Sequence, residues 1–186
     1  MKLPIVRYGD PVLRAKGTRV ATIDARIREL AENMLETMHE ANGIGLAAQQ
    51  IGEALQLTVI DVGLAEDQAS TLKLNGEEVD AKTSMPLVLL NPQLTLASET
   101  VVGVEGCLSF PEITADITRA SAVVAHAETI DGQTIELEAT GLLARALQHE
   151  VDHLHGILFI DRMSAVTKVA LRSRLKRMQK ENTPRL

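Results

Sequence analysis

The apolar residues near the start of the chain repeat with helical spacing. Intervals of three and four residues separate Ile23, Ile27, Leu30, Met34, Met38 and Ala41. This spacing is typical of one face of an amphipathic helix. Thr22 or Asp24 can cap the start of that helix, and Asn42-Gly43 can end it. We therefore predict a helix between these residues.

The middle of the chain favours strands. Segment 55–62 has nearly alternating apolar residues, and 87–92 is a short apolar run that ends at Pro92. The polar segment 63–85 contains the turn signal Asn75-Gly76, which predicts a loop insertion with an exposed hairpin. Segments 119–130 and 133–139 flank Asp131-Gly132. That dipeptide favours a two-residue hairpin turn, because both central residues need positive φ.

Two more helices are predicted in the last third of the chain. One covers 141–155, with Gly156 just past its end, and the other is a basic helix over 164–181. Grouped strands with helices at both ends do not alternate as in a parallel α/β protein. We expect an α+β fold with mostly antiparallel sheets and a single domain over residues 1–186.

Composition narrows the class of protein. A hydrophobic share of 45% and a charged share of 24% are typical of a folded globular domain. The single cysteine, Cys107, excludes an intramolecular disulfide bond. Neither a signal peptide nor a run of about 18 apolar residues is evident. We therefore expect a cytoplasmic protein with no membrane partner.

Charge is distributed unevenly. Residues 168–186 hold seven of the 19 lysines and arginines and only one of the 25 acidic residues. The acidic remainder and the small number of aromatic residues argue against sequence-specific DNA binding. The basic segment can dock on ribosomal RNA, or it can be a solvated helix face that packs on the body through Val169, Leu171 and Leu175.

The most specific local motif is H-E-x-x-H, formed by His149, Glu150 and His153 in the helix predicted over 141–155. At 3.6 residues per turn the two imidazoles lie roughly 40° apart, on the face of Leu142 and Ala146. They can converge on one ion, and Glu150 can reach a water on it. A pair of satisfied core histidines is the alternative. We assign the opposite arc to the polar side of the helix; it contains Arg145, Gln148, Asp152 and His155.

A third ligand would separate these alternatives. The extended zinc-peptidase motif needs a histidine where this chain has Phe159. Downstream of His153 the only acidic residues are Asp161 and Glu181, and neither suits a third ligand. The remaining soft donor is Cys107, although a lone cysteine is more often a small buried apolar residue.

Three segments together resemble the signature motifs of the peptide deformylase family. They are GIGLAAQQIG (43–52), EGCLSFP (105–111) and QHEVDHLHG (148–156). They occur in the family's order, and the resemblance extends over essentially the whole chain. There are two departures: segment 63–85 is longer than in a compact member, and Phe110 stands where a smaller β-branched residue is common.

The resemblance implies an enzyme that removes the formyl group from the N-terminal methionine of new polypeptides. Cys107, His149 and His153 would hold one divalent ion in a central helix-based site, with water as the fourth ligand. Iron(II) is the family's usual ion, and zinc, nickel and cobalt also suit a thiolate-containing site. The metal-bound water would attack the formyl carbonyl, with Glu150 as general base and then general acid.

The resemblance also implies how the N-formylmethionyl peptide is held. The Gln50 side-chain amide and the Leu108 backbone N–H would stabilise the oxyanion. The peptide would add as a strand along Ile44–Gly45 and Glu105–Gly106, and its methionine would lie near Ile44, Leu142 and Ala146. His39, His126 and His155 are expected to be structural or exposed.

Three alternatives stay open at this point. The first is a metallopeptidase. The second is a cysteine hydrolase with Cys107 as nucleophile and His149 as base. The third is a non-catalytic, ribosome-associated module with a structural metal.

Overall fold

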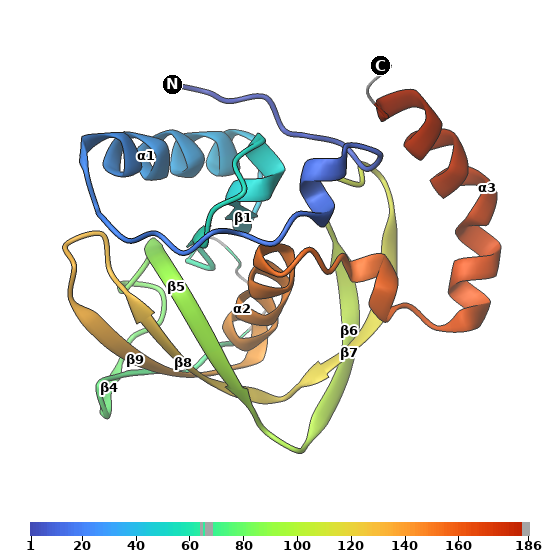
Figure 1. Ribbon diagram of the computed structural model, residues 1–186. Helices are drawn as coiled ribbons and strands as arrows, with labels where there is room; N and C mark the ends of the chain where they lie inside the picture. The colour runs from blue at the N-terminus through green and yellow to red at the C-terminus, as the bar shows by residue number, and fades with distance from the viewer. Residues whose placement is uncertain (64, 66–68, 184–186) are drawn as a thin grey trace.

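The computed structural model describes residues 1–63, 65 and 69–183. Its α-helices are α1 (Ala25–Glu40), α2 (Gly141–Leu154) and α3 (Ala165–Asn182), and single 3-10 turns form η1 (Pro11–Arg14), η2 (Ala48–Ile51) and η3 (Phe159–Arg162). All three predicted helices are confirmed (Figure 1). No helix in these ranges is long and apolar enough to cross a bilayer.

The strands form two sheets, in which every named pairing is antiparallel. The larger sheet has the order β1-β2-β5-β8-β9-β3-β4, and the smaller one pairs β6 with β7. The strands are β1 (Gly45–Ala47), β2 (Leu57–Ile60), β3 (Leu72–Leu74), β4 (Glu77–Val79), β5 (Leu87–Leu96), β6 (Thr100–Gly106), β7 (Thr114–Ala120), β8 (Ala122–Glu128) and β9 (Thr134–Thr140). The α+β prediction is therefore correct.

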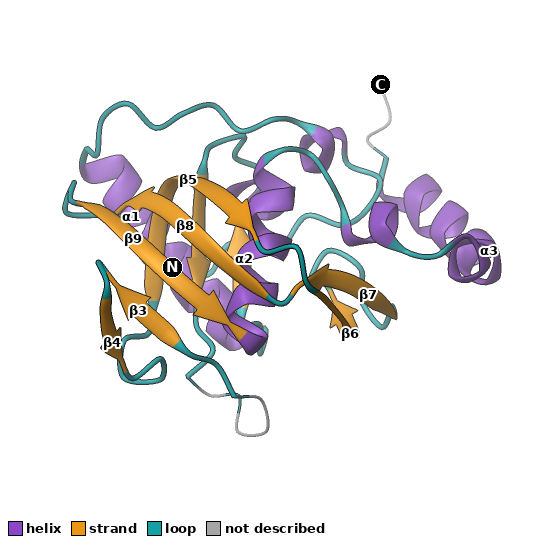
Figure 2. Cartoon of the chain, turned by 90° about the horizontal axis from the view of Figure 1, so that it is seen from below, coloured by secondary structure: helices purple, strands orange, loops and turns teal. Residues whose placement is uncertain are grey.

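Helix α2 is the centre of the molecule. It lies between the large sheet and the β6–β7 pair, and α1 packs against β1 and β2 (Figures 1 and 2). Twelve of its 14 residues are buried. The predicted polar arc is therefore wrong for Gln148 and Asp152, which are buried, whereas His155 is exposed. Burial is possible because β7 supplies partners: Gln148 bonds both backbone groups of Ala120, and Asp152 pairs with Arg119.

The helix ends follow the sequence signals. The Oδ1 atom of Asp24, and not a group of Thr22, accepts a hydrogen bond from the N–H of Ile27 at 2.9 Å and caps α1. Past the end of α1, Asn42 has φ 53°, and past the end of α2, Gly156 has φ 72°. Both left-handed residues stop the helices where the sequence predicts.

Strand β5 continues beyond the predicted end at Pro92, so that prediction is wrong. The pairing of β5 with β8 shifts register between Leu90 and Gln93, and Asn91 there has φ 53°. Such a bulge leaves a position without a ladder bond, which is where a strand tolerates a residue that lacks an N–H.

The hairpin at Asn75-Gly76 is confirmed, with φ values of 50° and 84°. It is more than a loop insertion, because β3 pairs with β9 and extends the main sheet. Residues 64 and 66–68 of that segment lie outside the described residues.

The second hairpin differs from its prediction. Of the pair Asp131-Gly132 only Gly132 has positive φ, 81°, and the N–H of Thr129 bonds the carbonyl of Gln133. The turn is thus a longer one than the predicted two-residue type. The preceding segment 119–130 is also not one strand, since residues 119 and 120 end β7.

Candidate active site

Cysteine and histidine side chains from two parts of the chain meet beside α2. Ligand atoms of Cys107, His149 and His153 all lie within 4.8 Å of one another. Cys107 follows the end of β6, and its Sγ is 3.4 Å from Nε2 of His153. One thiol and two imidazoles form a donor set that suits borderline divalent ions such as zinc and iron(II).

The surroundings of the two imidazoles also suit a cation. His149 Nδ1 bonds Oε2 of Glu105 at 2.9 Å, so Nε2 is the nitrogen left for an ion. Burial alone lowers the pKa of His149, but its interactions with Cys107 and Glu105 outweigh burial and raise this pKa to about 10. Burial lowers the pKa of His153 well below its ordinary value. The charges that draw a proton to His149 would equally favour a metal cation.

Glu150 lies between the imidazoles and β1. Its side chain is buried, and within the described ranges its Oε2 has no hydrogen-bond partner. A Cβ on Gly45 would lie 2.3 Å from Oε1 of Glu150, so only glycine allows this approach. Burial raises the pKa of Glu150 to about 7, although the neighbouring His149 lowers it. A carboxyl group in such a setting can both take up and release a proton near neutral pH.

The amide of Gln50 has a fixed orientation. Its Oε1 accepts a hydrogen bond from the N–H of Ala47 at 2.8 Å, so its Nε2 faces Ser109 Oγ at 3.3 Å and Cys107 Sγ at 3.5 Å. Gln49 points elsewhere, toward the carbonyl of Ala15. Gln50 is therefore the glutamine that presents donors beside the cysteine.

A pocket of about 640 Å³ opens over these groups. It brings together all six residues that the sequence analysis assigned to the peptide: Ile44, Gly45, Glu105, Gly106, Leu142 and Ala146. Gln50, Cys107, Leu108, His149 and Glu150 line it as well. The Glu105 carboxylate itself is bonded to His149 and to two arginines, so a bound peptide would meet Glu105 through its backbone.

The other histidines lie away from the pocket, as predicted. His155 is exposed and its Nδ1 bonds the carbonyl of Val151. His39 and His126 are also exposed and face Asp61 and Glu136. His155 therefore does not close the cysteine–histidine site.

Phe110, the unusual residue of the cysteine motif, is fully buried. Its ring stacks on Tyr8 at 4.7 Å and meets the edge of Phe159 at 5.1 Å. The large side chain is accommodated because two other aromatic rings form its surroundings.

The sequence analysis missed the charged groups behind the site. Arg119 and Arg145 both bond the Glu105 carboxylate, and their side chains are only 2% and 11% exposed. The signal was present as a glutamate two residues before Cys107, but nothing in the spacing indicates which arginine faces it.

Comparison with known proteins agrees with this geometry. The family model for polypeptide deformylase matches residues 2–169. A peptide deformylase of Opitutus terrae is 46% identical over 182 residues, which cover 97% of this chain and 94% of that protein. The crystal structure of peptide deformylase from Thermus thermophilus superposes with a TM-score of 0.82 at 39% identity and covers 97% of this chain and 99% of the other. The chain belongs to the peptide deformylase family.

Proposed function

We propose that this protein removes the formyl group from N-formylmethionyl peptides by hydrolysis, through the residues around the α2 pocket. The observation that carries the proposal is the meeting of Cys107, His149 and His153 beside the buried Glu150. Cys107, His149 and Glu150 also line the pocket. Family membership supports the reaction, and the geometry supports the roles given below to individual residues.

Cys107, His149 and His153 would hold one divalent ion. When bound, such an ion polarises a carbonyl and lowers the pKa of water, which makes water a better nucleophile. A thiolate ligand favours iron(II), zinc, nickel or cobalt over magnesium and calcium, and we propose iron(II) first.

Glu150 moves the proton in this proposal. Its side chain lines the pocket, and its Oε2 has no hydrogen-bond partner among the described residues, so it can take a proton from the attacking water and return it to the leaving amine. A general acid and base of this kind contributes about 10²- to 10⁴-fold in rate.

Gln50 and Leu108 would stabilise the charge that develops on the formyl oxygen. The amide of Gln50 is held with its nitrogen toward Cys107, and the Leu108 N–H follows directly in the chain. In comparable sites each donor is worth about 3 to 4 kcal/mol.

Strand β1 is an edge strand of the large sheet, and β6 has β7 as its single named partner. A peptide can therefore add as a strand between Ile44–Gly45 and Glu105–Gly106. The apolar side chains of Ile44, Leu142 and Ala146 would receive its methionine.

Formate release from a formyl-Met peptide tests the proposal. Wild-type protein should release formate, lose this activity with a chelator, and regain it with added metal. Glu150→Gln should keep the metal and release almost no formate. Two results would contradict the proposal: turnover that survives removal of the metal, as expected of a cysteine hydrolase, or equal cleavage of unformylated peptides, as expected of a metallopeptidase.

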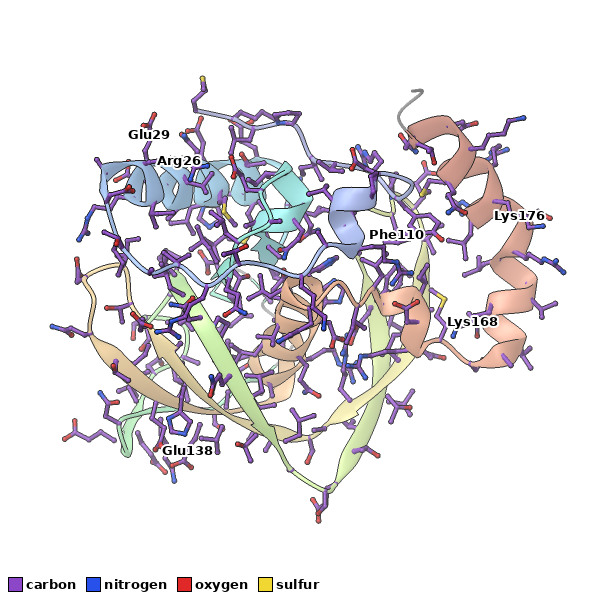
Figure 3. The ribbon with its side chains drawn as sticks, viewed as in Figure 1. Arg26, Glu29, Phe110, Glu138, Lys168 and Lys176 are labelled. Carbon is purple, nitrogen blue, oxygen red and sulfur yellow. The ribbon has the colours of Figure 1, made fainter. Side chains whose placement is uncertain are left out.

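We further propose that α3 docks on ribosomal RNA, which would place the enzyme in the cytoplasm beside newly made chains. Exposed Arg172, Lys176 and Lys180 follow one another at intervals of four and share a helix face. Figure 3 shows Lys176 pointing away from the body. Leu171 and Leu175 pack on the body as predicted, but Val169 is 73% exposed, so its predicted packing is wrong. Arg185, part of the predicted basic segment, lies outside the described residues.

Co-sedimentation with ribosomes at low salt tests this docking. Binding should weaken as salt rises and when Arg172, Lys176 and Lys180 are changed to glutamate. As a control, changing Arg26 and Arg28 on α1 to glutamate should leave ribosome binding intact. Absence of binding at low salt would exclude the contact.

A further inference from the structure

The Glu105 carboxylate is a buried junction between β6, β7 and α2. Arg119 donates to it twice, from Nε to Oε1 at 2.8 Å and from Nη2 to Oε2 at 2.9 Å. Arg145 Nη1 donates to Oε1 at 2.8 Å, and Nδ1 of His149 bonds Oε2 at 2.9 Å. Only 4% of the Glu105 side chain is exposed.

The two arginines are themselves fixed. Arg119 also bonds Asp152, whose carboxylate bonds Arg162 of η3. Arg145 also bonds the carbonyls of Ile117 and Val101. The Glu105 carboxylate makes four hydrogen bonds to these partners, so it cannot turn without breaking them. The cost of burying this carboxylate is offset by the two arginines, so it stays in place.

We propose that Glu105 is a positioning residue that holds the His149 imidazole with Nε2 toward Cys107 and His153. This inference rests on the proposed metal site. The bond to Nδ1 fixes both the tautomer and the ring angle of His149. His153 has no matching support in the described part of the chain, because its buried Nδ1 lacks a hydrogen-bond partner there.

The consequence is that one imidazole ligand is oriented by the protein before any ion arrives. Loss of the Glu105 contact should therefore loosen the ion, while the cysteine and both histidines remain. Changes at such supporting residues typically cost 10- to 100-fold in metal affinity.

Metal release separates this role from a merely structural one. Full-length protein is loaded with Co²⁺, and both its visible spectrum and the rate of Co²⁺ loss to a chelator are recorded. Glu105→Gln should lose Co²⁺ about 10- to 100-fold faster and show an altered spectrum.

Asp152→Asn is the matched control. It removes a second buried carboxylate from Arg119 without touching His149. It should lower the unfolding midpoint but keep wild-type metal release and the wild-type spectrum. Equal acceleration in both variants, or wild-type release in Glu105→Gln, would overturn the proposal.

A measurement on the unaltered protein covers the case in which Glu105→Gln does not fold. Proton NMR of Zn²⁺-loaded wild-type protein should find the His149 Nδ1 proton far downfield, as expected for a hydrogen bond to the Glu105 carboxylate, whereas an Nδ1 proton at an ordinary imidazole shift would overturn the proposal. Neither readout uses turnover. If Glu105 does not position His149, wild-type protein would still release formate. If the proposed function is wrong, the formate assay alone would show it.

Discussion

Gly45 lies against the carboxylate of Glu150, and any larger residue would displace that group. A methyl group at position 45 would meet Oε1 at 2.3 Å and the carboxyl carbon at 2.7 Å. Displacement of a catalytic group by about 1 Å can cost about 10²-fold in rate. We predict that Gly45→Ala lowers kcat/KM for formate release by about that factor. The same protein should bind metal as wild type does.

Metal analysis and formate kinetics on one preparation check this prediction. Wild-type turnover in Gly45→Ala would show that Glu150 does not need its observed position. Loss of the metal together with activity would instead indicate a general disturbance of α2.

Individual residues differ in how far the sequence revealed them. His149, Glu150 and His153 followed from helical spacing, because residues four apart share a face. Cys107 was only the remaining soft donor until the family resemblance made it a ligand, since no local spacing links it to His149, 42 residues further along. The contact of Glu105 with His149 stayed hidden, because a partner on another element is set by tertiary packing.

At the scale of elements, Asn91 joins the bulge in β5 to the segment that leads into α1. Its Oδ1 accepts from the N–H of Val20 at 2.8 Å and its Nδ2 donates to the Val20 carbonyl at 2.9 Å. Both bonds are buried, and Asn91 also holds φ 53°. Asn91→Ala leaves two buried backbone groups unsatisfied and strains a left-handed position.

We predict that Asn91→Ala lowers the free energy of unfolding by about 2 to 3 kcal/mol, the usual cost of unsatisfied buried groups. Urea unfolding of the variant and the wild type measures this difference. An unchanged midpoint would mean that the side chain does not hold the segment.

The local predictions succeeded where cap or turn residues mark the end of an element. The helix ends and the Asn75-Gly76 hairpin are such cases. Strand β6 was not predicted, because Val101, Val102 and Val104 follow no strict alternation, and β7 was predicted only at residues 119 and 120. The two strands pair with each other, and Arg145 of α2 bonds the Val101 carbonyl of β6. No local sequence pattern indicates either contact.

At the scale of the whole molecule, an ion pair ties η1, near the start of the chain, to η3, which precedes α3. Arg14 of η1 bonds Asp161 of η3, and both side chains are near 40% exposed. Burial alone raises the pKa of Asp161, but the hydrogen bond from Arg14 outweighs it, so this pKa lies below its ordinary value. A carboxylate with a lowered folded-state pKa stabilises the protein above the unfolded pKa of about 4. This stabilisation is lost as the pH falls from there through the folded-state pKa.

Asp161→Asn should therefore lower the free energy of unfolding at pH 7, by no more than about 1 kcal/mol because the pair is partly exposed. The difference from wild type should shrink as the pH falls through 4. Urea unfolding at a series of pH values provides the test. A difference that does not change with pH would assign the effect to lost packing.

The overall class followed from the order of strands and helices, whereas the burial of α2 did not. Periodicity alone predicts that the polar residues of α2 face solvent. The structure buries Gln148 and Asp152 because β7 presents a matching carbonyl, N–H and guanidinium. Helical periodicity cannot separate a polar face toward water from a polar face toward a satisfied interior.

X-ray absorption of the metal-loaded protein tests the central claim most directly. The account predicts one sulfur and two imidazole nitrogens around the ion, with the remaining position open to water. The sulfur should disappear in Cys107→Ser. A coordination sphere without sulfur in the wild type, or one closed by a fourth side chain, would contradict the account.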